Sequence, residues 1–154
     1  MKTNISVLGI GTAGCNVIKQ LSKQNPKTNC FHYAKEYPEE NINKAFEDAK
    51  VLILVTGLGG QTGSAVIVNV AKKAKDLGIK TIAVVTTPFV FEGPIRRGRA
   101  SQAVSALQEI VDELHISEDE NLKAKYPDLV LLNAFTKSDI EVISIIQSIL
   151  ISIS

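Results

Sequence analysis

The sequence predicts an α/β fold in which helices cover both faces of a doubly wound parallel sheet, giving three layers. Short apolar runs alternate with segments of helical periodicity along the chain. Two of these runs lead directly into glycine-rich loops, as strands of such sheets often do. The length of 154 residues fits one domain, so residues 1–154 are expected to form a single unit.

The first part of the chain predicts two strands, each followed by a helix. Residues 5–8 form a short apolar run, and apolar residues then recur at helical spacing over 14–24, where an Asn-Pro pair ends the helix. A weaker strand is expected at 29–33, followed by a short acidic and amidic helix over 39–49. A strand, a helix and a second strand in this order predict a right-handed βαβ unit.

The middle of the chain predicts the centre of the sheet. Residues 51–55 are five consecutive apolar residues, which suits a parallel strand covered on both faces. A helix follows the second glycine loop and ends at Leu77, where the next residue is a glycine that can stop it. A buried strand is expected at 80–85, and the helix after it at 95–113.

The last part predicts a short strand at 114–117, a polar segment with one or two helical turns, and a final helix from residue 130 to the terminus. That helix is too apolar to pack only one face against a sheet. We expect the apolar side chains that the sheet does not cover to form an exposed patch for self-association or for a partner. The alternatives are that the segment forms an ordinary buried helix or that it frays into a β-like tail. Its apolar residues are Ile140, Val142, Ile143, Ile145, Ile146, Ile149, Leu150, Ile151 and Ile153.

Composition excludes several classes of protein. The formal net charge is +1, which gives no reason to expect a nucleic-acid partner. Hydrophobic residues make up 45% of the chain, so disorder is excluded as its main state. Two cysteines are too few for a disulfide framework. The sequence shows neither a signal peptide nor a membrane span, and a reducing cytoplasm is therefore the expected location.

The first glycine loop, GIGTAGCN at residues 9–16, lies between the first strand and the first helix. Glycines there let the backbone approach a phosphate, and the helix N-terminus offers free N–H groups. Alone, the pattern is a weak signal that a tight turn would also explain. It is compatible with a dinucleotide site too, because Glu36 follows Gly14 by 22 residues, close to the spacing of a ribose-binding acid.

The second glycine loop, GLGGQTGSA at residues 57–65, favours a phosphate site more strongly. It can wrap successive N–H groups around a phosphate, and the hydroxyls of Thr62 and Ser64 are further candidate donors. Two such loops on neighbouring strands predict a di- or triphosphate at the carboxyl edge of the sheet. Neither loop contains the lysine of a Walker motif, so backbone dipoles and a metal ion are expected to hold the phosphates.

These segments resemble the nucleotide-binding half of the FtsZ/tubulin superfamily. The family signature G-G-G-T-G-[ST]-G stands here as GGQTGSA at 59–65, and the stretch AKDLGIKTIAVVTTPFVFEG at 74–93 is similar to FtsZ along its whole length. The loop at 9–16 and VLLNAF at 130–135 resemble the family's first loop and the start of its central helix. The resemblance implies a Rossmann-like FtsZ/tubulin nucleotide-binding domain.

The resemblance also implies how the two loops would hold a guanine nucleotide. Asn16 matches an asparagine that contacts guanine. The first loop would approach the α- and β-phosphates through backbone N–H groups of Gly11, Thr12, Ala13, Gly14 and Cys15. The second loop would surround the β- and γ-phosphates with Gly57, Gly59, Gly60, Gln61, Thr62 and Gly63.

Other residues take their expected roles from the same resemblance. Glu92 and Arg96 match an acid and an arginine on the sugar and phosphate side of the nucleotide. Phe135 matches the aromatic residue that packs on guanine. The carboxylate that reads the guanine edge falls at Ile140 by strict count, and an offset of one residue assigns it to Asp139.

The chain departs from the family pattern at several points. Gln61 and Ala65 replace signature glycines, and only about twenty residues separate Cys30 from Val51, where the family has a long insert. No segment matches the acidic catalytic loop or the second domain. Hydrolysis is therefore expected to be weak or to depend on a partner, since losing the group that positions the attacking water costs orders of magnitude in rate.

The leading hypothesis is an FtsZ-like protein that binds GTP or GDP, with Mg²⁺ bridging the phosphates, and that serves cell division or cytoskeletal assembly. One alternative is a nucleotide-free interaction module that docks on or caps a full-length relative. Another is an NAD-binding Rossmann protein that uses the first loop and Glu36. No protein residues are assigned to a metal site of their own.

Overall fold

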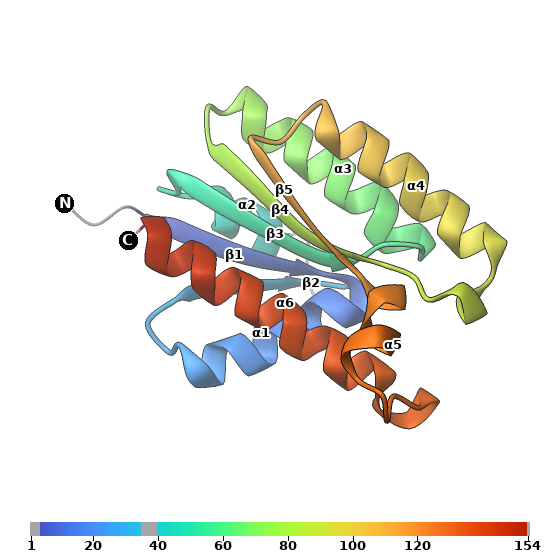
Figure 1. Ribbon diagram of the computed structural model, residues 1–154. Helices are drawn as coiled ribbons and strands as arrows, with labels where there is room; N and C mark the ends of the chain where they lie inside the picture. Colours follow the sequence, from blue (N-terminus) through green and yellow to red (C-terminus); the bar gives the residue numbers. More distant parts are fainter. Residues whose placement is uncertain (1–3, 35–39, 154) are drawn as a thin grey trace.

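The computed structural model describes residues 4–34 and 40–153, and these form a parallel sheet with the strand order β2-β1-β3-β4-β5 (Figure 1). Every neighbouring pair of strands is parallel. The strands are β1 (Ile5–Ile10), β2 (Asn29–Tyr33), β3 (Val51–Gly57), β4 (Lys80–Thr87) and β5 (Glu113–Glu118). The order changes direction between β1 and β3, so their carboxyl ends flank the crevice where sheets of this kind bind ligands.

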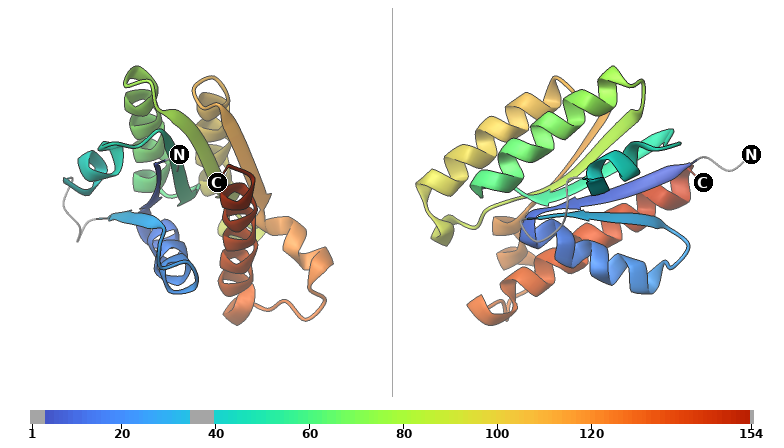
Figure 2. Two further views of the ribbon diagram at one scale, coloured as in Figure 1. Left: turned by 90° about the vertical axis from the view of Figure 1, so that its left-hand side faces the viewer. Right: turned by 180° about the vertical axis from the view of Figure 1, so that it is seen from behind.

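Helices cover both faces of this sheet. Figures 1 and 2 show α2, α3 and α4 on one face and α1 and α6 on the other, which confirms the predicted three-layer α/β fold. The helices are α1 (Gly11–Gln24), α2 (Glu40–Phe46), α3 (Gln61–Asp76), α4 (Pro94–Gln108), α5 (Leu122–Lys125) and α6 (Leu131–Ile153). Two 3₁₀ turns are η1 (Val90–Glu92) and η2 (Asp119–Asn121).

Alternation along the strands divides the core into two halves. Leu8, Leu54 and Ala83 are aligned across β1, β3 and β4 and pack against α2, α3 and α4. Their neighbours Val7 and Ile53 belong to the half that α1 and α6 cover. Because side chains alternate between the two faces, a strand covered on both sides must be apolar throughout. This explains the unbroken apolar run in β3.

The final helix buries more of its apolar surface than the sequence suggested. It remains helical to Ile153, so the β-like tail is wrong. Val142, Ile143, Ile146 and Ile149 pack against the sheet with exposed fractions of 7% or less. The outer face carries Ser144 and Ser148 as well as Ile140 and Ile151. Large exposed apolar side chains gather instead around the start of α6, at Val130, Leu131, Leu132 and Phe135.

The helix predicted over 95–113 ends earlier, at Gln108. Asp112 explains this difference because it is already part of the sheet. Its backbone N–H donates to the carbonyl of Thr81 at 2.9 Å, and its carboxylate accepts from the Thr81 N–H at 2.8 Å. These bonds place the next residue, Glu113, in register with β4, so pairing in the sheet prevails over helix propensity.

No helix in residues 4–34 or 40–153 has both the length and the apolar character that crossing a bilayer requires.

Candidate functional site

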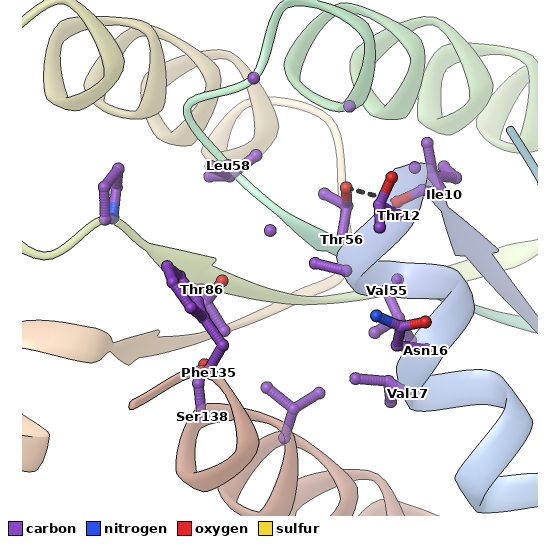
Figure 3. Close-up of a pocket in the computed structure, with 18 of the residues that line it drawn as sticks. Ile10, Thr12, Asn16, Val17, Val55, Thr56, Leu58, Thr86, Phe135 and Ser138 are labelled. Atoms are coloured by element: carbon purple, nitrogen blue, oxygen red, sulfur yellow. Dashed lines mark hydrogen bonds between the residues drawn. The ribbon is translucent and has the colours of Figure 1, made fainter. Parts of the chain in front are cut away.

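A cavity of about 570 Å³ opens at the carboxyl ends of β1, β3 and β4 (Figure 3). This volume lies within the usual range for small-molecule sites. Of the residues predicted to bind the nucleotide, Cys15 and Gly59 are not in this lining, and the side chain of Thr62 lies outside the described part of the structure. The predicted residues in the lining are Gly11, Thr12, Ala13, Gly14, Asn16, Gly57, Gly60, Gln61, Gly63, Glu92, Arg96, Phe135 and Asp139.

Two helices begin at this cavity with uncapped N-termini. The residues that precede α1 and α3 are Ile10 and Gly60, and neither makes a side-chain capping hydrogen bond. Neither helix has an acidic residue in its first turn. The first N–H groups of a helix have no partner within the helix, and together with the helix dipole they attract anions. Both helices therefore direct hydrogen-bond donors and partial positive charge at one cavity.

Close packing explains why residue 14 in the first loop is a glycine, but it does not explain the glycine at position 60 in the second loop. A Cβ on Gly14 would lie 2.4 Å from the carbonyl oxygen of Val55, so α1 could not sit this close to β3 with any other residue there. A Cβ on Gly60 would meet no atom within 4 Å. Gly60 thus keeps space open in the cavity wall, whereas Gly14 is explained by the close packing of α1 on β3.

Side chains of Ser64, Pro88 and Arg99 support the second loop, and of these three only Pro88 also lines the cavity. The hydroxyl of Ser64 accepts a hydrogen bond from the Gly59 N–H at 3.0 Å, so Ser64 does not face the cavity as expected. Gly59 has a φ of 112° and backs onto Pro88, whose Cγ would lie 2.9 Å from an added Cβ. Nη1 of Arg99 donates to the Gly59 carbonyl at 3.4 Å. The side chain of Thr62 lies outside the described part of the structure.

Cys15 is buried, with 4% of its surface exposed. Its thiol lies 3.7 Å from the carbonyl oxygen of Gly9 and 3.6 Å from that of Tyr33, on the side of α1 that faces the sheet. The thiol therefore points away from the cavity, and because α1 begins at Gly11 the Cys15 N–H lies beyond the unpaired N–H groups of the first turn.

The wall opposite α1 belongs to α6 and carries an aromatic ring and a carboxyl group. Phe135 is half-exposed and lies edge-on to Phe89, with ring centroids 5.7 Å apart. In Figure 3, Phe135 lies across the cavity from Asn16 on α1. Asp139 also lines the cavity, and burial raises its pKa to about 6, whereas Ile140 is exposed and outside the lining. A ring face beside a half-buried carboxyl suits a heterocyclic base with N–H donors.

Glu92 and Arg96 stand where η1 meets α4. Oε2 of Glu92 accepts a hydrogen bond from the Phe89 N–H at 2.8 Å, and Oε1 lies 3.5 Å from Nε of Arg96. Glu92 therefore stabilises the η1 turn through this hydrogen bond and orients the side chain of Arg96. Among the described residues of the lining, Arg96 is the one cation.

Sequence reasoning missed Asp119, which is the first residue of η2 and only 3% exposed. Ser138 on α6 donates a hydrogen bond to its Oδ1 at 2.5 Å. Burial raises the pKa of Asp119 to about 7, the bond from Ser138 opposes this, and the charges of Glu92 and Asp139 add to it. Asp119 directly follows β5, so its place at the carboxyl edge of the sheet was the available signal.

Beside the two glycine loops, the described residues of the cavity lining offer hydroxyl and amide oxygens but no carboxylate. Thr12, Thr56 and Gln61 lie there, and Thr56 donates a hydrogen bond to the Ile10 carbonyl at 2.8 Å. Within residues 4–34 and 40–153, no cluster of three or more His, Cys, Asp and Glu side chains could hold a metal ion. A bound Mg²⁺ would accordingly take most of its ligands from phosphate oxygens and water, as it often does in nucleotide sites.

Comparison with known proteins gives the family. Residues 32–127, more than half of the chain, match the model of the Tubulin/FtsZ family, GTPase domain. The chain belongs to the tubulin/FtsZ family. Among curated relatives in this family, the Cell division protein FtsZ of Pseudomonas aeruginosa is 42% identical over 101 residues, which are 65% of this chain and 26% of the relative. That of Coxiella burnetii is 32% identical over 154 residues, 95% of this chain and 40% of the relative.

Solved structures share the fold. An empty FtsZ dimer from M. jannaschii superposes with a TM-score of 0.83 at 27% identity, covering 93% of this chain and 53% of that one. CetZ1 from Haloferax volcanii, solved as a GDP-bound monomer, has a TM-score of 0.73 at 14% identity, covering 92% of this chain and 58% of that one. The chain thus spans about half the length of these structures and less than half of the curated relatives described above.

Proposed function

We propose that the cavity binds a guanine nucleotide, GTP or GDP. The observation that carries the proposal is that two uncapped helix N-termini, on neighbouring strands, open on one cavity. Their N–H groups would hold the phosphates, while Phe135 would pack on the base and Asp139 would accept its N–H donors. Mg²⁺ would bridge the phosphates and neutralise part of their charge. Membership of the tubulin/FtsZ family supports this assignment.

GTP hydrolysis by this part of the chain is proposed to be weak or partner-dependent. The carboxylates of the lining come from η1, η2 and α6, while the loops before α1 and α3 contribute none among the described residues. No acid on these loops is therefore placed to orient water against a γ-phosphate. A partner that supplies such a group would raise the rate. The relatives named above are cell division proteins, so a role in division or cytoskeletal assembly in the cytoplasm belongs to the proposal.

The first experiment asks which nucleotide the protein carries and binds. Nucleotide that copurifies is identified by chromatography, and the emptied protein is titrated calorimetrically with GTP, GDP, ATP and NAD in Mg²⁺. Tight binding that selects guanine nucleotides supports the proposal, and tighter binding of ATP or NAD contradicts it.

Gly60→Ala tests whether the glycine loop holds the phosphates. The added Cβ meets no protein atom within 4 Å, so the fold should tolerate it, but it would stand in the cavity wall near the phosphates. We expect the affinity for GDP to fall at least tenfold while the circular dichroism spectrum stays unchanged. Gly98→Ala is the matched control, because Gly98 also has open space around it and lies on α4, outside this cavity. Equal affinities in both variants would contradict the placement of the phosphates.

The second candidate is an interaction module that docks on a second copy or on a full-length relative. The exposed apolar side chains Val130, Leu131 and Leu132 at the start of α6 favour it, since Leu132 is 95% exposed. Light scattering of the protein alone and mixed with a full-length relative tests this candidate. Leu132→Ser should weaken any association found without changing nucleotide affinity, because Leu132 is outside the cavity lining.

An NAD site is the weakest candidate. A dinucleotide site would use only the first glycine loop, and it would not explain why a second glycine-rich loop opens on the same cavity. Its expected ribose-binding acid, Glu36, lies outside the described residues. The NAD titration above tests it directly.

A further inference from the structure

The cavity carries more negative than positive side chains, although its proposed ligand is a polyanion. Its described charged residues are Glu92, Arg96, Asp119 and Asp139. The single cation, Arg96, has Glu92 as its ion-pair partner at 3.5 Å. Neither aspartate forms an ion pair with a lysine, arginine or histidine within the described part of the chain.

Asp119 is the most deeply buried of these acids. Its hydrogen-bond donor is the neutral hydroxyl of Ser138, and the charged groups that act on it from η1 and α6 are the carboxylates of Glu92 and Asp139. On its own segment, Glu120 accepts from the Val90 N–H at 2.7 Å and pairs with a lysine, so it points to other partners. An ionised Asp119 would thus be surrounded by like charge in a place with little water.

We propose that Asp119 carries a proton when the nucleotide is bound, so that nucleotide binding takes up a proton from solution. This inference rests on the proposed function, because the ligand is the guanine nucleotide. A neutral carboxyl still accepts the hydrogen bond from Ser138 at Oδ1, and its own O–H becomes a donor. Protonation removes one of the negative charges that the phosphates would otherwise meet.

The size of the effect follows from linkage between binding and protonation. With a pKa of about 7, Asp119 is close to half-protonated at neutral pH in the empty protein. If the bound state keeps the proton throughout, the affinity falls about tenfold between pH 6 and pH 8. Tighter binding at the lower pH is the expected direction.

Calorimetric titration with GDP in Mg²⁺ at pH 6, 7 and 8 tests the proposal on the wild type and on Asp119→Asn. Asparagine has the same shape and still accepts from Ser138, but it cannot titrate. The phosphates of GDP titrate equally in both experiments, so the difference between the two pH slopes belongs to Asp119. We expect the wild-type affinity to lose about tenfold more than that of the variant between pH 6 and pH 8. Buffers of different ionisation enthalpy should report about half a proton more taken up by the wild type at pH 7, and nearly one at pH 8.

Two outcomes would overturn the inference, and they differ from each other. Equal pH slopes in wild type and variant, with GDP bound by both, would refute proton uptake by Asp119 and leave the proposed function intact. No binding by the wild type at any pH would remove the proposed function and this inference with it.

Ser138→Ala provides a second variant in case Asp119→Asn does not fold. The hydrogen bond from Ser138 lowers the pKa of Asp119, so its removal should extend the tight-binding range to higher pH. A midpoint that stays in place or moves to lower pH would contradict the proposal.

Discussion

Asp119 also bears on the stability of the empty protein, because its carboxyl group is buried in the folded chain and solvated in the unfolded one. Its pKa in the folded chain, about 7, lies above the ordinary aspartate value of 3.8. The folded protein therefore holds a proton that the unfolded chain has lost, and stability decreases as pH rises from about 4 to 7. Above pH 7 the cost reaches at most about 4 kcal/mol, since each unit of pKa corresponds to about 1.4 kcal/mol.

Asp119→Asn removes this cost, and urea unfolding measures it. At pH 8 the variant should be more stable than the wild type, and the difference should shrink towards zero near pH 4. A difference that is independent of pH would show that folding does not raise the pKa of Asp119.

Phe135 offers a prediction about the base. Phe135→Ala should weaken GDP binding by about 1–3 kcal/mol, the usual worth of stacking an aromatic ring on a base, when measured by calorimetry. Phe91→Ala is the matched control. Phe91 is also half-exposed and stacks on Phe89 with ring centroids 4.9 Å apart, but it is not part of the cavity lining. Because Phe91 also lies edge-on to Phe135, with ring centroids 6.4 Å apart, a small loss in Phe91→Ala is compatible with the prediction, whereas an unchanged affinity in Phe135→Ala would mean that the base does not pack on Phe135.

For single residues, the sequence predicted where the backbone of the glycine loops lies better than it predicted the direction of individual side chains. Gly60 and Gln61 line the cavity because a glycine loop between a strand and a helix fixes where its peptides lie. Ser64 faces away because one turn of helix separates it from the loop, and the sequence does not show which side of that turn is packed. Asp119 was missed because its environment comes from Ser138, a partner 19 positions away.

Among the helices, α4 contains an avoidable weakness. Gly98 is exposed in the helix interior, and a Cβ there would meet no atom within 4 Å. Glycine in such a place costs up to about 1 kcal/mol relative to alanine. Gly98→Ala should therefore raise the free energy of unfolding by about 0.5–1 kcal/mol, as measured by urea denaturation. A loss of stability would show that α4 needs the conformational freedom of glycine at this point.

Element types were predictable from periodicity, but element ends depended on tertiary contacts. The end of α4 is set by Asp112, whose bonds to Thr81 can form only when β4 is in place. For α6 the count of apolar residues overstated its exposed surface, since Val142, Ile146 and neighbouring residues pack against the sheet beside α1. Serines on the outer face could have indicated this arrangement.

For the molecule as a whole, binding of the nucleotide should increase the stability of the folded state. A ligand that binds only the folded state stabilises it by about 2.7 kcal/mol when present at 100 times its dissociation constant. GDP in Mg²⁺ should therefore raise the melting temperature of the wild type by several degrees in a thermal unfolding experiment. Gly60→Ala should show a much smaller rise at the same GDP concentration. An equal rise in both proteins would place the stabilising site elsewhere.

The arrangement of α1 and α6 on a shared face of the sheet has a consequence for protein synthesis. Val7, Ile53 and Val84 on that face are covered partly by α1, which is made early, and partly by residues 131–153, which are made last of the described elements. Until these leave the ribosome, the nascent chain has its strands but lacks part of their cover. Apolar strands exposed in this way aggregate readily. The growing chain is thus expected to be most prone to aggregation just before translation of α6 is complete.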